Sequence, residues 1–527
     1  MKRMHLSAVL ATLLVAGCGD ELTAEERETQ VKDHMETLRP DAAALQSFLQ
    51  DMPKGGDLHS HTSGAISMEK LIQWGSEDGA CVNTTTFVAS NPCAANSVPM
   101  ANTNTDRSLY NAVLGAWSME GFSGPLLDAH QHFFDAFGKY GAVQTDARND
   151  DSYADILSKA GHNNQIYVEL MQSFGNSAGG NIAVGLFSPS DTWDKATLLA
   201  KREQLITTPA FTTALNKQAA SIAATLSGAR QLLGCDTANP DPGCNVQVRL
   251  IASANRTGTR EAVFGQWVYS YELAQLVPEV VGVNLVSPEE HANSLSFYND
   301  EMFALGTLND FNQQQPNRKQ VHVSLHAGEL IPEVLSSSTQ DQITFHIRNA
   351  VAVAHAERIG HGVDVLGETF GDGAEDLMND MRDADVMVEI CLSSNKALLG
   401  ASGSKHPLAK YLEHGVPVTL ATDDEGILRG NITQEYVAAA TDQGLDYAAL
   451  KHAARVSLQH AFIEGASLWA KAEDYTHAVD ACAKDTLGAE APSASCASYL
   501  SENARASLQW KLEGQLSSFE DGIVGKK

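Results

Sequence analysis

This 527-residue chain has few basic residues, no long hydrophobic run and no internal repeat. It contains 36 Lys and Arg against 65 Asp and Glu, which gives a formal net charge of −29 at pH 7. Because so acidic a surface repels phosphate groups, the composition excludes nucleic acid and anionic lipid as partners. The length and the 43% of hydrophobic residues are ample for a large folded core.

The apolar run at the N-terminus covers only Leu6–Ala16 and follows Lys2 and Arg3. These 11 residues are too few to span a membrane, which takes about 20, and their order is that of a signal peptide. Cys18 stands where a bacterial lipoprotein carries its lipid. We therefore expect residues 1–17 to be a lipoprotein signal peptide and Cys18 to be lipidated. An ordinary secretory signal with an incidental cysteine is the alternative.

Cleavage of that signal removes two positive charges, so the mature charge becomes −31, from −29 less 2. Such a protein would be an exported lipoprotein at the outer membrane, in the periplasm or at the cell surface. Its contact with the membrane would be made through the lipid anchor alone.

Cysteine spacing also indicates export. Six cysteines form three local pairs, and each pair brackets a stretch rich in Pro, Asn, Gly, Ala or Ser, which predicts a loop closed by a disulfide. Such disulfides are expected only in an oxidising compartment. Cys391 lies in an apolar run and is predicted to be a buried free thiol. The predicted disulfides are Cys81–Cys93, Cys235–Cys244 and Cys482–Cys496.

Eight short β-branched runs alternate with longer helical segments, which predicts an α/β fold, the parallel (β/α)8 or TIM barrel. The alternative, a doubly wound open sheet, needs a glycine-rich loop after its first strand, and the sequence has none. The predicted strands are Gly55–His61, Ile166–Gln172, Val246–Ala252, Val280–Val286, Val321–His326, Arg358–Val365, Val386–Leu392 and Val416–Thr422.

The barrel is predicted to cover residues 55–465. Residues 62–150 are far too long for an ordinary connection and are predicted to be a helical insert after the first strand. This insert would be a lid over the barrel mouth or the contact surface of a homodimer. Residues 18–54 are predicted to be helices and a tether that spaces the barrel from the membrane. Residues 466–527 are predicted to be a helical extension with a disulfide loop.

Metal-ligand side chains stand at the C-terminal ends of three predicted strands, where such barrels place their chemistry. His59 and His61 are two apart and so point the same way, while His326 and Asp423 end two other strands. Three histidines and one carboxylate suit one Zn²⁺ ion better than Mg²⁺. A bound metal ion of this kind brings the pKa of water to about 7.

Three more residues near these ligands are candidates for acid–base work and substrate binding. Glu329 follows a strand end and suits a proton shuttle, although a helix-start glutamate is the alternative. His361, between two glycines, could orient or deprotonate the attacking water, or could be a turn residue. Asp424 is free to contact substrate. His355 and His406 follow no strand end and are assigned to structure. The residues thus predict a metal-dependent hydrolase.

The motifs together resemble the adenosine/AMP deaminase superfamily of zinc-dependent barrel hydrolases, in family order from residue 55 to about residue 435. Residues 48–55 further resemble the secreted, growth-factor-like adenosine deaminases. The motifs are His59-Ser60-His61, His326-Ala327-Gly328-Glu329, Gly360-His361-Gly362, Ser393-Ser394-Asn395 and Thr422-Asp423-Asp424.

This resemblance implies a role for each site residue. Glu329 would protonate the purine ring at N1, His361 would position the attacking oxygen, and Asp424 would meet ring N7 by a hydrogen bond. The implied reaction is deamination of adenosine, and of 2′-deoxyadenosine, to inosine or its deoxy form plus ammonia outside the cytoplasm. The implied zinc ligands are His59, His61, His326 and Asp423.

Two positions depart from the family pattern. Ser63 stands where the well-known adenosine deaminases have an aspartate that meets the ribose, and Ser287 stands where a glycine normally contacts the ring. Both serines are therefore predicted to contact substrate. They also motivate an alternative substrate, another aminopurine or a modified adenosine. A non-catalytic surface-binding or growth-factor-like protein is a third hypothesis.

Overall fold

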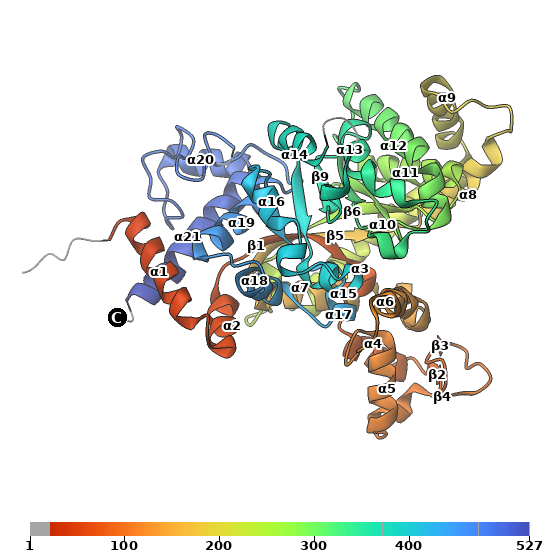
Figure 1. Cartoon of the computed structure of the whole chain (residues 1–527), viewed down its shortest axis with the longest axis horizontal. Coiled ribbons are helices and arrows are strands. Elements are labelled where there is room, and N and C mark those ends of the chain that lie inside the picture. Colours follow the sequence, from red (N-terminus) through yellow and green to blue (C-terminus); the bar gives the residue numbers. More distant parts are fainter. Residues whose placement is uncertain (1–21, 370–372, 473, 526–527) are drawn as a thin grey trace, which may run out of the picture.

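The computed structural model describes residues 22–369, 373–472 and 474–525. The predicted signal peptide and Cys18 lie outside these residues. Eight parallel strands form one sheet in the order β1-β5-β6-β7-β8-β9-β10-β11 (Figure 1). Their bounds are β1 Gly55–His61, β5 Gln165–Gln172, β6 Gln247–Asn255, β7 Val280–Val286, β8 His322–Ala327, β9 Arg358–His361, β10 Met387–Ile390 and β11 Val418–Leu420.

The sheet closes into a barrel at the carboxyl ends of its first and last strands. Ser60 of β1 pairs in parallel with Asp423, three residues past the end of β11. The Asp423 N–H donates to the His59 carbonyl at 2.8 Å, and the His61 N–H donates to the Asp423 carbonyl at 3.2 Å. The prediction of a (β/α)8 barrel is confirmed, and its seam lies at the candidate metal ligands.

Three predicted strands end earlier than the sequence pattern suggests. The strand predicted over Arg358–Val365 ends at His361, the one over Val386–Leu392 at Ile390, and the one over Val416–Thr422 at Leu420. His361 and Asp423 have φ values of 69° and 59°, in the left-handed region where an extended strand cannot continue. The chain turns where these side chains must face the barrel mouth.

Helices surround the barrel and cover both of its ends. Among the residues described, no helix combines the length and apolar character needed to cross a membrane. The helices that follow the insert are α7 Asn149–His162, α8 Ser177–Leu186, α9 Lys195–Ile206, α10 Pro209–Leu232, α11 Arg260–Leu276, α12 Ala292–Gln313, α13 His346–Ala352, α14 Ala374–Asp383, α15 Leu392–Leu399, α16 Leu408–Glu413, α17 Glu425–Leu428, α18 Ile432–Thr441 and α19 Tyr447–Gln459.

The insert after β1 is only partly helical, which corrects the prediction. It contains a three-stranded antiparallel sheet in the order β3-β2-β4, whose central strand begins at Cys81 (Figure 1). Strands of two or three residues are too short to show a period in the sequence, and the Cys81–Cys93 disulfide pins them together. The insert elements are α3 Thr62–Ala65, α4 Met68–Glu77, β2 Cys81–Asn83, β3 Ala89–Ser90, β4 Ser97–Pro99, α5 Arg107–Trp117 and α6 Leu126–Tyr140.

The N-terminal helices pack on the barrel, so residues 22–54 are not a free spacer. Helices α1 (Ala24–Leu38) and α2 (Ala42–Asp51) bury Val31 and Leu45, and α1 lies against the C-terminal helix α21 (Ala504–Val524). In Figure 1 α1 and α21 therefore lie side by side. An apolar stripe within a mostly charged helix, which the tether prediction overlooked, explains this contact. The extension also contains α20 (Ala494–Glu502).

All three predicted disulfides are present, and they join Cys81 to Cys93, Cys235 to Cys244 and Cys482 to Cys496. Cys391 is a buried free cysteine, as predicted. Each disulfide closes a local loop of 9 to 14 residues at the periphery of the barrel.

Candidate active site

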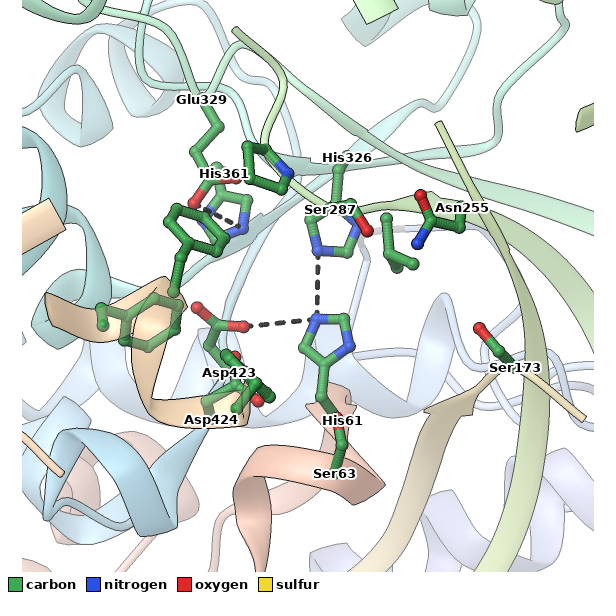
Figure 2. A pocket seen from close by; sticks show the side chains of 15 residues that line it. His61, Ser63, Ser173, Asn255, Ser287, His326, Glu329, His361, Asp423 and Asp424 are labelled. Atoms are coloured by element: carbon green, nitrogen blue, oxygen red, sulfur yellow. Dashed lines mark hydrogen bonds and ion pairs between the residues drawn. The ribbon is translucent and has the colours of Figure 1, made fainter. Parts of the chain in front are cut away.

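The four predicted metal ligands converge at the carboxyl end of the barrel. His61 lies between the others: its Nε2 is 3.1 Å from Nε2 of His326 and 3.3 Å from Nε2 of His59. The same atom is 3.3 Å from Oδ1 of Asp423. Figure 2 shows His61, His326 and Asp423 pointing toward one another from β1, β8 and the loop after β11. Strands far apart in the sequence thus bring their ligand atoms to one point.

Two neighbours fix which nitrogen of each buried histidine carries hydrogen. Nδ1 of His59 lies 2.7 Å from a Glu389 oxygen, which can only accept when ionised, so Nδ1 donates. Nδ1 of His326 lies 3.1 Å from Oδ1 of Asn284, an oxygen that also accepts the Leu285 N–H at 2.6 Å. Both Nε2 atoms therefore present lone pairs to the centre of the cluster, where only a cation satisfies them.

The charges around the cluster also require a positive ion. Burial opposes protonation of His59, but hydrogen bonds to Asp423 and Glu389 prevail and raise its pKa to about 10, so Nε2 attracts a positive charge, which is a proton without metal and the metal ion once it is bound. Despite burial, its histidine neighbours hold the pKa of Asp423 well below the ordinary value. Burial lowers the pKa of His61 to about 4, so this ring is neutral and able to ligate. The donor set and the charge fit a divalent metal ion.

Buried charged side chains hold Glu389, the carboxylate that accepts from His59, in place. Arg358 forms ion pairs with Glu389 at 2.7 Å and with Glu169 at 2.6 Å, and none of the three is more than 1% exposed. Ser324 donates its hydroxyl to Glu389 at 2.9 Å. The carboxylate that orients His59 is therefore itself held on two sides.

A second chain of hydrogen bonds fixes the tautomer of His361. The Leu408 N–H donates to Nδ1 of His406 at 3.1 Å, so Nε2 of His406 carries the hydrogen and donates to Oδ1 of Asn395 at 3.0 Å. The Asn395 amide then donates to Nδ1 of His361 at 2.9 Å. The hydrogen of neutral His361 must lie on Nε2, which faces the cavity.

This tautomer decides between the two roles left open for His361. Burial lowers its pKa to about 3, so the ring is neutral, and an Nε2–H can donate to an attacking oxygen but cannot accept its proton. His361 together with His59, His326 and Asp423 also forms a group whose ligand atoms lie within 4.8 Å of one another. Because Nε2 of His361 carries hydrogen, His61 is the better fourth ligand.

Glu329 and Asp424 are both poised to carry a proton. Burial, with the nearby Asp423 charge, raises the pKa of each carboxyl well above its ordinary value. An oxygen of Glu329 lies 3.7 Å from Nε2 of His361, and Oδ1 of Asp424 is buried without a hydrogen-bond partner within the described residues. Gly64 makes room for Asp424, because a Cβ there would lie 1.8 Å from that oxygen.

These side chains open into a cavity of about 470 Å³. Aromatic side chains of α6 form one wall, so the insert does reach the barrel mouth. Of the described residues that line the cavity, none is Lys or Arg. The lining residues are His61, Ser63, Phe133, Phe134, Phe137, Ser173, Asn255, Val286, Ser287, Pro288, His326, Glu329, His361, Asp423 and Asp424.

Both serines that depart from the family pattern line this cavity. Ser287 has a φ of 84°, which is strained for any residue but glycine, and this matches its place where the family has glycine. Ser173 and Asn255 lie on one side of the cavity, across from Glu329 and His361 on the other (Figure 2). The cavity therefore has a proton-carrying side and a neutral polar side.

Several supporting residues escaped the sequence analysis. Glu389 and Asn284 are single polar residues inside apolar strand runs, and that isolation was a usable signal. His406 was assigned to structure, yet it is buried and orients His361 through Asn395. It reaches the site from a loop, a position that strand-end reasoning does not cover.

Residues 216–469 match the family model described as adenosine deaminase. Adenosine deaminase of Klebsiella pneumoniae is 32% identical over 228 residues, which are 42% of this chain and 58% of that protein. Adenosine deaminase of Escherichia coli is 28% identical over 244 residues, 46% of this chain and 61% of that protein. The matches thus span about three fifths of these relatives' length.

Among solved structures, an amidohydrolase from Burkhoderia ambifaria with bound Zn shares the fold. The two are 13% identical, the alignment covers 97% of each chain, and the TM-score is 0.50. Over residues 216–469, about half of its length, the chain is therefore similar to the adenosine deaminase family.

Proposed function

We propose that this protein is an exported, zinc-dependent adenosine deaminase that converts adenosine, and 2′-deoxyadenosine, to inosine or its deoxy form and ammonia. The observation that carries the proposal is the cluster of four convergent metal ligands beside a buried carboxyl, Glu329, that keeps its proton. This arrangement supplies what hydrolysis at a purine C6 needs: an activated water and a proton for the ring.

Four residues would hold the zinc ion: His59, His61, His326 and Asp423. When bound, the ion supplies Lewis-acid activation of a water molecule near neutral pH. The unshared lone pairs on Nε2 of His59 and His326 support this ligand set. Nitrogen-rich ligation favours zinc over magnesium.

Glu329 acts on the ring as general acid. Its raised pKa keeps the carboxyl protonated at neutral pH, so it can give a proton to N1, which draws electrons from C6. His361 donates its Nε2 hydrogen to the oxygen that attacks C6 and so orients it. In the overall reaction water gives its oxygen to C6 and the bond from C6 to the amino nitrogen breaks. One water hydrogen leaves with the amino group as ammonia, and the other restores to Glu329 the proton given to N1.

Asp424 binds the ring rather than the metal. A neutral purine N7 has no hydrogen, so the bond must run from the protein to the ring. The raised pKa of Asp424 supplies a protonated carboxyl, and its unpartnered oxygen lies in the cavity lining. This carboxyl would select purines, because a pyrimidine lacks the N7 acceptor.

The cavity lining favours a nucleoside over a nucleotide. A phosphate needs cationic partners, and the lining residues that the structure describes include no Lys or Arg. Ser63, Ser173 and Asn255 offer neutral groups suited to sugar hydroxyls.

Deamination of another aminopurine or of a modified adenosine is the second candidate, because Ser63 and Ser287 replace two family contacts with substrate. A panel of adenosine, 2′-deoxyadenosine, adenine, an N6-methylated adenosine and adenosine 5′-monophosphate tests both candidates, with products identified by chromatography. The first predicts the highest kcat/KM for adenosine. Faster turnover of another panel member, with adenosine barely converted, would refute it.

Export is part of the proposal. The three disulfides support an oxidising compartment, and the order of charged, apolar and small residues before Cys18 supports lipidation. Metabolic labelling with a palmitate analogue would test it: wild type should take up label, and Cys18→Ser should not. Equal labelling of both proteins would refute lipidation at Cys18.

A further inference from the structure

The loop that carries Glu329 is held through its backbone by another buried carboxylate, Glu289. The Glu329 N–H donates to Oε2 of Glu289 at 2.7 Å, and the Gly328 N–H faces Oε1 at 3.4 Å. Glu289 follows β7, whereas Glu329 follows β8. This carboxylate therefore links the ends of two neighbouring strands at the proposed general acid.

Glu289 carries a charge although no part of it is exposed. Burial opposes its ionisation, but the hydrogen bond from His346 and the charges of His346 and Arg256 hold its pKa below the ordinary value. Nδ1 of His346 lies 2.6 Å from Oε1, and a guanidinium nitrogen of Arg256 lies 3.8 Å away. All three side chains are fully buried.

His346 cannot readily move, so it holds Glu289 in place. Its ring stacks on Tyr298 at 3.6 Å with the planes 1° apart, and the Tyr298 hydroxyl donates to the His346 carbonyl at 2.7 Å. Nε2 of His346 lies 3.0 Å from the side-chain oxygen of Gln342. Both ring nitrogens and one ring face of His346 are therefore engaged.

Only a carboxylate satisfies this arrangement. Oε2 of Glu289 accepts from the Glu329 N–H, while Oε1 faces the Gly328 N–H, Nδ1 of His346 and the guanidinium of Arg256. The NH2 group of a glutamine would point either at the Glu329 N–H or at the donors of Gly328 and Arg256, so the loop would have to move. A misplacement of about 1 Å at a catalytic group can cost about 100-fold in rate.

We propose that Glu289, clamped by His346, is a positioning residue that sets the place of the Glu329 carboxyl over the substrate ring. It acts through the backbone, since Glu289 itself is absent from the described residues that line the cavity. This inference rests on the proposed function, in which Glu329 is the general acid. Neither Glu289 nor His346 has a direct part in binding metal or substrate.

The first test is steady-state kinetics of Glu289→Gln with adenosine at pH 7, on zinc-loaded and folded protein. We expect kcat to fall about 10- to 100-fold while KM stays within about threefold, because ground-state binding does not need the proton transfer. Glu301→Gln is the matched control. Glu301 is equally buried, but its oxygens have no hydrogen-bond partner among the described residues, so kcat should be unchanged.

The decisive test is a double-mutant cycle. If Glu289 works only through Glu329, then adding Glu289→Gln to Glu329→Gln should cost less than about threefold further, because the group it positions is already gone. A merely structural role predicts that the two losses multiply. If Glu289→Gln folds poorly, His346→Gln replaces it in the double-mutant cycle. His346→Gln alone should lower kcat by a smaller factor, and it should cause no further loss when added to Glu329→Gln.

The outcomes separate this inference from the proposed function. If wild type is active and the losses of kcat in the single variants multiply in the double variants, the positioning role is overturned but the proposed function is not. A Glu289→Gln protein with wild-type kcat has the same consequence. A fully zinc-loaded wild type that deaminates no member of the substrate panel overturns the proposed function and the positioning role together.

Discussion

Replacing Glu389 by glutamine should weaken zinc binding without removing any metal ligand. Glu389 accepts the Nδ1 hydrogen of His59 at 2.7 Å and so leaves Nε2 free to bind metal. A glutamine can instead donate its amide to Nδ1, which moves the imidazole hydrogen to Nε2 and blocks the ligand. The variant therefore populates a form of His59 that cannot bind the ion.

The magnitude follows from two independent estimates. A hydrogen bond to a charged group contributes about 1.5–3 kcal/mol. Loss of an outer partner of a metal-bound histidine typically costs about 10- to 100-fold in affinity, which is about 1.4–2.7 kcal/mol. Both estimates predict a rise of about 10- to 100-fold in the zinc dissociation constant of Glu389→Gln.

Competition with a chelating dye of known zinc affinity measures this constant directly. Glu169→Gln is the matched control, since Glu169 is the other carboxylate on Arg358 but does not contact His59. Both variants disturb the same buried arginine and should lose stability, yet only Glu389→Gln should lose zinc affinity. Equal weakening in both variants, or none in Glu389→Gln, would refute the reasoning.

Three further substitutions test other parts of the site and fold. Asn395→Asp should move the imidazole hydrogen of His361 from Nε2 to Nδ1, because a carboxylate accepts a hydrogen bond from Nδ1. We expect kcat to fall about 100-fold with little change in KM, and a wild-type kcat would contradict the hydrogen-bond chain. Gly64→Ala should displace Asp424 and lower kcat/KM at least about tenfold in the same assay. Unchanged kinetics would contradict the contact between Asp424 and ring N7. Burial raises the pKa of Glu301 from 4.5 to about 8, so its contribution to stability is complete below pH 4.5 and is lost as pH rises through 8. Glu301→Gln should therefore gain stability relative to wild type between about pH 5 and about pH 9, by at most about 5 kcal/mol, measured by urea unfolding; a pH-independent difference would contradict it.

The sequence predicts the barrel and its ligands because strand ends are visible in the chain. His59 and His61 two apart, and Asp423 after an apolar run, need only the two-residue period of a strand to be placed on one rim. Ser63 and Ser287, which also line the cavity, were predicted from the family resemblance instead. Wherever a function follows a regular element, its position could be read from the sequence.

Residues that act through other residues could not be placed in this way. His406 and Glu289 reach the site from loops, and their partners lie 11 and 40 residues away along the chain. Their roles depend on hydrogen-bond direction, which only coordinates supply. The strands β2, β3 and β4 were missed for a different reason, since two or three residues cannot show alternation.

The charged N-terminal helix shows a further limit of pattern reading. The many charged residues of α1 suggested a solvent-exposed tether, but Val31 and Met35 are fully buried against the body of the protein. Two apolar residues four apart are enough to dock a helix when a complementary surface, here α21, lies beside it. A long-range partner of this kind is invisible in the local sequence.

Conversion of adenosine by protein stripped of metal and then reloaded tests the central claim most directly. Ultraviolet absorbance follows the change from adenosine to inosine, and released ammonia is measured alongside. The account predicts no conversion after chelation and full recovery with one equivalent of zinc per chain. A zinc-loaded protein that leaves adenosine unchanged, or one that converts it equally fast without metal, would contradict the account.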